Sequence, residues 1–249
     1  MLHRLMARVA MALAAGTFLI FARPAMAQMG GQNVPDLSGF ADEIAQSMAS
    51  PETNTVKPSD GGLFQSGLKV PSVKPGSTAQ GIGKQLRESI EQKAGPQPAL
   101  QKLESEMPKA LTGVEDALQK FGMSKRDMGV ALAFAFVTFW ETANKQEVPI
   151  EGSKTAGKAI AMAIAATWKP KYAKMDPATQ EKIYETLLIS PTLLSTFATQ
   201  FDKAGKTQEA DGMRQTAGQL FEKLTGAPAN QVTISPEGKI SGLGEGKQQ

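Results

Sequence analysis

The chain is 249 residues long and 41% apolar, with 27 Lys and Arg, 24 Asp and Glu, one His and no Cys. The first 27 residues hold the single His and three Arg but no acidic residue, so a chain without them has 24 basic and 24 acidic residues and neither His nor Cys. Such a chain excludes Ser-His-Asp and Cys-His catalysis, zinc sites of the His/Cys kind, haem with His or Cys ligation, and iron–sulfur clusters. We therefore predict no cofactor and no metal. The neutral balance also argues against nucleic-acid binding, which depends on neutralising phosphates.

The N-terminus has the pattern of a secretory signal peptide. A short segment with two arginines, residues 1–8, precedes an apolar run, residues 9–22. An Ala-Met-Ala sequence at 25–27 then places small residues at the positions that signal peptidase recognises. Spanning a bilayer takes about 20 apolar residues, so this run is too short for an anchor. We predict cleavage between Ala27 and Gln28, and a periplasmic or secreted protein without an integral membrane span after cleavage.

Residues 28–79 are predicted to form a flexible arm. The stretch 28–85 contains nine Gly, five Pro and only two aromatic residues, so it buries little apolar surface to offset the entropy of ordering. Within it, residues 36–49 carry apolar side chains every three or four positions and form either a short docking helix or a transient one. Residues 70–75 are predicted to be extended linker.

Residues 80–226 are predicted to fold as an all-α bundle of about five to seven helices, because apolar residues recur there every three or four positions. A capping box at residues 124–127 is expected to open the most apolar helix, residues 128–140. A helix that is apolar all round is buried all round, so this one should lie at the centre. The following helix, 153–169, is rich in small residues and is expected to pack closely against it.

Four prolines mark predicted helix boundaries. Residues 100–121 form either one long helix or two helices that meet at Pro108. Pro170 is expected to end the helix of small residues. Asp176-Pro177 and Ser190-Pro191 are each expected to begin a helix, since Asp or Ser caps a helix and Pro fits its first turn.

The C-terminal part is predicted from its turn residues. The last amphipathic helix is expected to end at Gly226, because glycine commonly ends helices. Residues 227–249 form a short tail in which 232–240 could make a small hairpin. The apolar segments 128–140 and 156–168 could instead be a membrane-inserting hairpin, but both are short and Lys158 interrupts the second, which favours a core.

Part of this pattern resembles a known kind of protein. The buried helix ends in Phe139-Trp140-Glu141, an Ala-rich helix follows, and two short predicted helices then start with Pro. In these respects residues 107–225 are similar to an uncharacterised family of exported bacterial helical proteins. The resemblance implies a helical, exported domain and transfers no activity or functional residue. Residues 190–224 also look like one tetratricopeptide-type hairpin, although a single hairpin does not make a solenoid.

Two groups of residues are candidate sites, and each also has a structural interpretation. Trp140, Glu141 and Asn144 could form an aromatic platform beside a carboxylate, or a Trp at the edge of the core with a solvated Glu. Glycosidase chemistry needs two carboxyls roughly 5–9 Å apart, and Glu147 and Glu151 are close in sequence, although nothing in the sequence fixes their geometry. Trp168 and Tyr172 flank lysines and could bind an anionic polymer, although lysines also stabilise a helix C-terminus. Packing is the favoured interpretation of both groups, and Trp140, Asn144, Trp168 and Tyr172 are the candidate ligand surface.

The sequence therefore predicts an exported, non-enzymatic helical binding or scaffold module of a bacterial envelope or secretome. Its predicted partner is an envelope protein or a cell-wall component. The alternative is a carboxylate-dependent enzyme that acts on glycans such as peptidoglycan, with Glu141 as the catalytic residue. A partly buried acid pair in a cleft beside Trp140 would distinguish the two.

Overall fold

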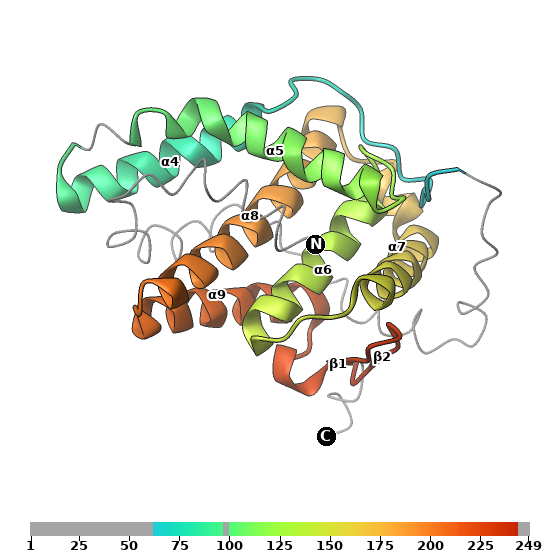
Figure 1. Cartoon of the computed structure of the whole chain (residues 1–249). Helices are drawn as coiled ribbons and strands as arrows, with labels where there is room; N and C mark the ends of the chain where they lie inside the picture. The colour runs from blue at the N-terminus through green and yellow to red at the C-terminus, as the bar shows by residue number, and fades with distance from the viewer. Residues whose placement is uncertain (1–61, 97–99, 244–249) are drawn as a thin grey trace.

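A computed structural model describes residues 62–96 and 100–243 (Figure 1). The predicted signal segment, its cleavage site at Ala27 and Gln28, and residues 28–61 lie outside the described residues. Six α-helices and one short hairpin make up the described part, which confirms the all-α prediction. The elements are α4 (Ser77–Ala94), α5 (Leu103–Lys120), α6 (Met128–Asn144), α7 (Ile150–Tyr172), α8 (Pro177–Lys203), α9 (Thr207–Thr225), the 3-10 turn η5 (Ala229–Gln231), β1 (Thr233–Ile234) and β2 (Ile240–Ser241).

Helix α6 is the centre of the bundle, as its composition predicts. It packs against α7, α8 and α9, while α4 and α5 pair with each other along the upper edge in Figure 1 and meet α8. Every residue of α6 from Met128 to Trp140 is buried. Gly129 has a specific role in this packing, because a Cβ atom there would lie 2.9 Å from the carbonyl oxygen of Ala161 on α7. The absence of a side chain therefore lets the two helices approach closely.

Three of the prolines do not end or begin helices. Pro108, Pro170 and Pro191 lie inside α5, α7 and α8, so the predicted end at Pro170 and the predicted start at Ser190-Pro191 are wrong. An interior proline removes a backbone hydrogen bond and costs about 3 kcal/mol. In α8 this cost is offset by packing, because Pro191 and the leucines on both sides of it are buried. The prediction was right at Asp176-Pro177, where the Asp176 side chain accepts from the Thr179 amide at 2.9 Å.

The predicted capping box before α6 is only half formed. Asp127 is the N-cap residue, and its carboxylate accepts from the Val130 amide at 3.0 Å. Ser124 does not cap the helix. Its amide donates to the carbonyl of Phe64 at 2.9 Å and joins the helix start to a distant segment.

That segment is residues 62–76, here called the strap, and it corrects the predicted arm. The strap runs along the bundle with Leu68 and Val70 each only 2% exposed. The Phe64 amide donates to the Gly122 carbonyl at 2.7 Å, and the Val70 amide donates to the Arg126 carbonyl at 2.8 Å. Residues 62–79 are therefore part of the packed domain, although the sequence predicted a flexible arm as far as residue 79.

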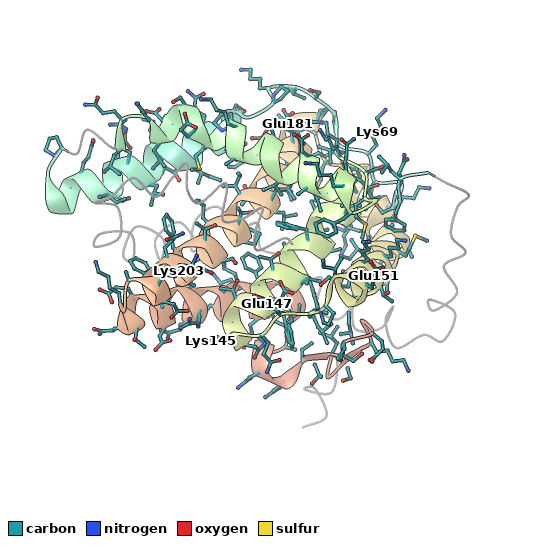
Figure 2. All side chains as sticks on the ribbon, viewed as in Figure 1. Lys69, Lys145, Glu147, Glu151, Glu181 and Lys203 are labelled. Carbon is teal, nitrogen blue, oxygen red and sulfur yellow. The ribbon has the colours of Figure 1, made fainter. Side chains whose placement is uncertain are left out.

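Carboxylates from distant helices hold the strap and the first turn of α4. Asp127 accepts hydrogen bonds from the amides of Ser66 and Gly67 at 2.8 and 3.2 Å. Glu181 of α8, labelled in Figure 2, accepts from the Lys74 amide at 2.6 Å. One turn later in α8, the fully buried Glu185 accepts from the amides of Gly76, Thr78 and Ala79 at 2.5, 2.9 and 3.0 Å. Helix α4 has no cap from its own flanking residues, so Glu185 supplies one across the fold.

The chain after α9 folds back onto α6. Gly226 ends α9 in the left-handed conformation, as predicted. β1 and β2 then pair antiparallel, with Ile234 opposite Ile240, which confirms the small hairpin. Among the helices that the structure describes, none combines the length and the apolar character that crossing a membrane requires.

Candidate functional site

Trp140 and Asn144 attach the C-terminal segment to α6. The Trp140 side chain is 4% exposed, and its indole nitrogen donates to the Val232 carbonyl at 2.7 Å. The Asn144 amide nitrogen, one turn later, donates to the Ala229 carbonyl at 3.1 Å. Both residues therefore have a packing role, and neither offers an open aromatic platform.

Trp168 and Tyr172 also lie in the core. Trp168 is fully buried and its ring packs against that of Tyr172, with 5.6 Å between the centroids. The Tyr172 hydroxyl donates to the Lys69 carbonyl of the strap at 2.8 Å. The structure therefore does not bring Trp140, Asn144, Trp168 and Tyr172 together on an exposed surface.

Glu141 differs from these residues, because it faces a cavity. It lies in the last turn of α6, and its carboxylate accepts from the Val148 amide at 2.9 Å. Burial raises the pKa of Glu141 from 4.5 to about 7, with the hydrogen bond from Val148 opposing the rise and the nearby Glu147 adding to it. A carboxyl group with a pKa near neutrality changes its charge under physiological conditions.

The cavity lies between α6 and α7 and measures about 340 Å³. Small-molecule sites typically measure about 300–1,000 Å³, and an apolar cavity of about 150 Å³ holds benzene. Helix α6 forms one wall with Val130, Ala133, Phe134, Val137, Thr138 and Glu141. The other walls come from the end of α5, the α6–α7 connection, the start of α7 and Ser195 of α8.

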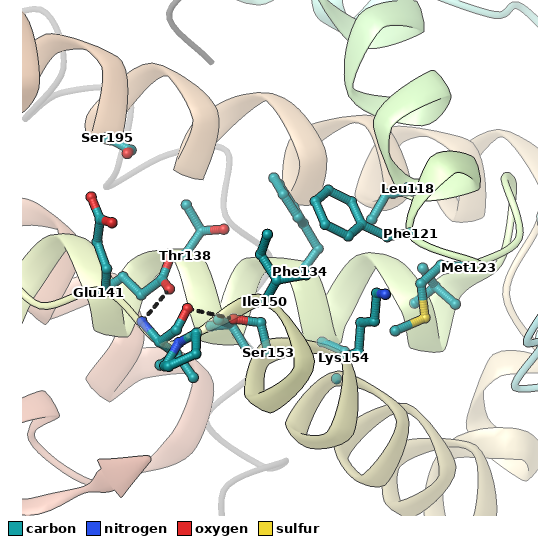
Figure 3. A pocket seen from close by; sticks show the side chains of 17 residues that line it. Leu118, Phe121, Met123, Phe134, Thr138, Glu141, Ile150, Ser153, Lys154 and Ser195 are labelled. Atoms are coloured by element: carbon teal, nitrogen blue, oxygen red, sulfur yellow. Dashed lines mark hydrogen bonds between the residues drawn. The ribbon is translucent and has the colours of Figure 1, made fainter. Parts of the chain in front are cut away.

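The two ends of the cavity differ in chemistry, as Figure 3 shows. Leu118, Phe121 and Met123 lie at one end, and Thr138, Glu141 and Ser195 lie at the other. Thr138 is 2% exposed, and its hydroxyl oxygen has no hydrogen-bond partner among the described residues. A buried polar atom without a partner costs free energy. The oxygen is itself closed to solvent, so Thr138 lines the cavity with other atoms of its side chain.

The entrance lies at the α6–α7 connection. Glu147, in that connection in Figure 2, is exposed, and Ile150 at the start of α7 is 38% exposed although it is large and apolar. Lys154 also lines the cavity, and its ammonium group pairs with the exposed Glu151 at 2.8 Å. A molecule can therefore enter beside Glu147 and Ile150 without crossing the core.

The sequence predicted Glu141 as a candidate, with Glu147 and Glu151 as nearby carboxyls, but not the cavity, which Glu147 lines and Glu151 does not. Phe134 and Thr138 belong to a helix that is apolar on nearly all sides, so its sequence does not show which face lines the cavity. Gly157, in the helix of small residues, is the one sequence feature that points to the cavity. A Cβ atom at this position would meet only the terminal methyl of Met123, at 3.3 Å, so there is open space beside it. In the described part of the chain, no group of three or more acidic or His/Cys side chains is arranged to hold a metal ion.

Residues 68–239 match the model of a family of unknown function (DUF6683), and the chain belongs to that family. The matched segment includes most of the strap and the whole cavity, so both belong to the family domain. The resemblance to an uncharacterised helical family is confirmed. No curated protein and no solved structure matches the chain.

Proposed function

We propose that this protein is a non-enzymatic binding module that encloses a small apolar molecule in the α6–α7 cavity. The observation that carries the proposal is the cavity itself, about 340 Å³ in volume, with mainly apolar walls and the polar residues Glu141 and Ser195 at one end. Apolar walls favour apolar ligands because binding removes apolar surface from water, at about 25 cal/mol per Å². A few polar groups at one end then fix the orientation of the ligand.

A neutral fluorescent probe tests this proposal. We expect phenylnaphthylamine to bind the protein with saturable fluorescence and a stoichiometry of one. The variant Gly157→Leu fills the cavity from α7 and should abolish the signal. Gly81→Leu is the matched control, because a Cβ on Gly81 in α4 meets no atom within 4 Å and the change lies far from the cavity. Equal binding by both variants would contradict the proposed site.

Export is part of the proposal and rests on the signal-peptide pattern. The protein would act in the periplasm or outside the cell, and an envelope protein or a cell-wall component would be its partner. Expression of the full chain in a bacterium, followed by fractionation and N-terminal sequencing, tests this. Recovery of a chain that begins at Gln28 outside the cytoplasm is expected, and a chain that keeps residues 1–27 would contradict it. A pull-down from envelope extract then tests for a stoichiometric protein partner.

A glycan-acting enzyme is the second candidate, and one observation favours it. Glu141, whose pKa burial raises to about 7, and Glu147 line the same cavity, and a carboxyl with such a pKa can act as a general acid. The apolar walls, and a Trp140 that lies in the core and does not line the cavity, favour the binding module. Clearing of peptidoglycan by the wild type that Glu141→Gln abolishes would make the protein an enzyme.

A further inference from the structure

Glu141 and Glu147 are the two carboxyl groups that line the cavity, and Glu141 lies at its polar end on α6. The Glu141 carboxyl accepts one hydrogen bond, from the Val148 amide. An ionised carboxylate only accepts hydrogen bonds, and its two oxygens have room for further donors. The ligand group that belongs beside Glu141 is therefore a donor.

We infer that the cavity binds a cationic amphiphile, with its ammonium group beside Glu141 and its apolar body along α6. The inference rests on the proposed function and adds the chemical class of the ligand. An ammonium group has three donors and no acceptor, which matches the acceptors at this end of the cavity. Moving a cation out of water is costly unless it is paired and hydrogen-bonded, and Glu141 supplies the opposite charge.

The charges around the cavity favour a cation over an anion. The lining contains two acids, Glu141 and Glu147, and one base, Lys154. The charge of Lys154 is already balanced by Glu151, at 2.8 Å. The parts of α5 and α8 that line the cavity add no charged side chain. A carboxylate ligand would therefore meet like charge at the polar end.

The apolar body is accommodated by the rest of the α6 wall. Val130 and Glu141 are 11 residues apart on α6, which at about 1.5 Å per residue makes the wall about 16 Å long. Between them, Phe134 and Val137 face the cavity, and Phe121 and Leu118 close its far end. This elongated shape fits a linear alkyl chain or a small aromatic body.

Binding of a cation should depend on pH around neutrality. Burial raises the pKa of Glu141 to about 7, and a bound cation lowers it again. A primary alkylammonium stays charged, because its pKa resembles that of lysine, about 10.4. Glu147 from the α6–α7 connection is the charged side chain of the lining that acts on Glu141, and Lys154 of α7, which is paired with Glu151, lies toward Met123 (Figure 3). Affinity should therefore rise about tenfold from pH 6 to pH 8 as Glu141 ionises.

Three probes of equal chain length test the inference by calorimetric titration. n-Octylammonium should bind more tightly than n-octanol or octanoate at pH 8, and should bind about tenfold more weakly at pH 6. The affinity of n-octanol, which carries no charge, should be the same at pH 6 and pH 8. Glu141→Gln should remove both the preference for the cation and its pH dependence, whereas Glu222→Gln, which removes an exposed acid of α9, should change neither.

The outcomes separate this inference from the proposed function. Equal binding of the three probes, tighter binding of octanoate, or a cation preference that survives Glu141→Gln would overturn the assignment of a cationic ligand. Binding of n-octanol and phenylnaphthylamine would still support an apolar ligand in those cases. If no probe binds the folded wild type, the inference and the proposed function both fail.

Discussion

Replacing Glu141 with Gln should stabilise the protein above neutral pH, because the wild type must ionise a partly buried carboxyl. Folding raises the pKa of Glu141 from 4.5 to about 7. One pKa unit corresponds to about 1.36 kcal/mol, so the ionised side chain lowers the free energy of unfolding by about 3 kcal/mol. Well below pH 4.5, Glu141 is protonated in both the folded and the unfolded protein, so it does not lower the free energy of unfolding. From pH 4.5 to 7 the unfolded chain releases its proton first, so stability falls over this range. A Gln side chain can still accept from the Val148 amide, at 2.9 Å in the wild type, and it does not titrate.

Urea unfolding of both proteins at pH 4 and pH 8 measures this effect. The variant should match the wild type at pH 4 and exceed its free energy of unfolding by about 3 kcal/mol at pH 8. The buried Glu185, whose pKa burial also raises, contributes equally to both proteins and cancels in the difference. Glu222→Gln controls for the loss of one negative charge. Parallel stability curves of wild type and Glu141→Gln across this range would refute the reasoning, since they would mean that Glu141 ionises without cost.

Four further changes test the strap and the cavity. Glu185→Ala should lower the free energy of unfolding in urea by at least about 3 kcal/mol, because three amides at the start of α4 lose their acceptor; a loss below about 1 kcal/mol would contradict the long-range cap. Asp127→Ala should speed hydrogen exchange of the Ser66 and Gly67 amides, and unchanged exchange would show that the carboxylate does not hold the strap. A chain that begins at residue 80 should be less stable than one that begins at residue 62 by more than about 3 kcal/mol, since it loses the buried Leu68, Val70 and Ala79 and the amides that pair with Glu185; equal melting temperatures would mean that residues 62–79 do not pack. Thr138→Val should raise the free energy of unfolding by about 1–2 kcal/mol in the absence of ligand, and a loss of stability would mean that the hydroxyl has a partner.

Local patterns in the sequence predicted the elements that depend on local chemistry. The apolar run from Met128 predicted a central helix, Asp176-Pro177 predicted a helix start, and Gly226 predicted a helix end. The helix boundaries predicted at Pro170 and Pro191 are wrong because they also rest on local chemistry alone. Proline tends to interrupt a helix, but the packing of α7 and α8 keeps both helices continuous, and helix propensity does not include packing.

The strap could not be predicted, because its order comes from residues far away in the chain. Its glycines and prolines are typical of flexible segments. The strap is held in place by the carboxylates of Asp127, Glu181 and Glu185, which lie about 60 to 110 positions away in the sequence. In the same way, the sequence identified Glu141 as a candidate but not the cavity, since an empty volume depends on how five elements pack.

Thr138 and Glu141 are best understood together. A bundle that served only as a packed scaffold would gain stability from an aliphatic residue at position 138 and a neutral one at position 141. Instead, an unpartnered hydroxyl and a desolvated carboxyl lie one turn apart on α6, in two residues that line the same cavity. Local features that reduce stability are commonly found where a protein binds or reacts, because the missing interactions are completed by the ligand. On this argument, the double variant Thr138→Val, Glu141→Gln should be more stable than the wild type at pH 8 and should no longer distinguish n-octylammonium from n-octanol. Gain of stability and loss of selectivity in one protein would identify this end of the cavity as the part of the fold that recognises the ligand.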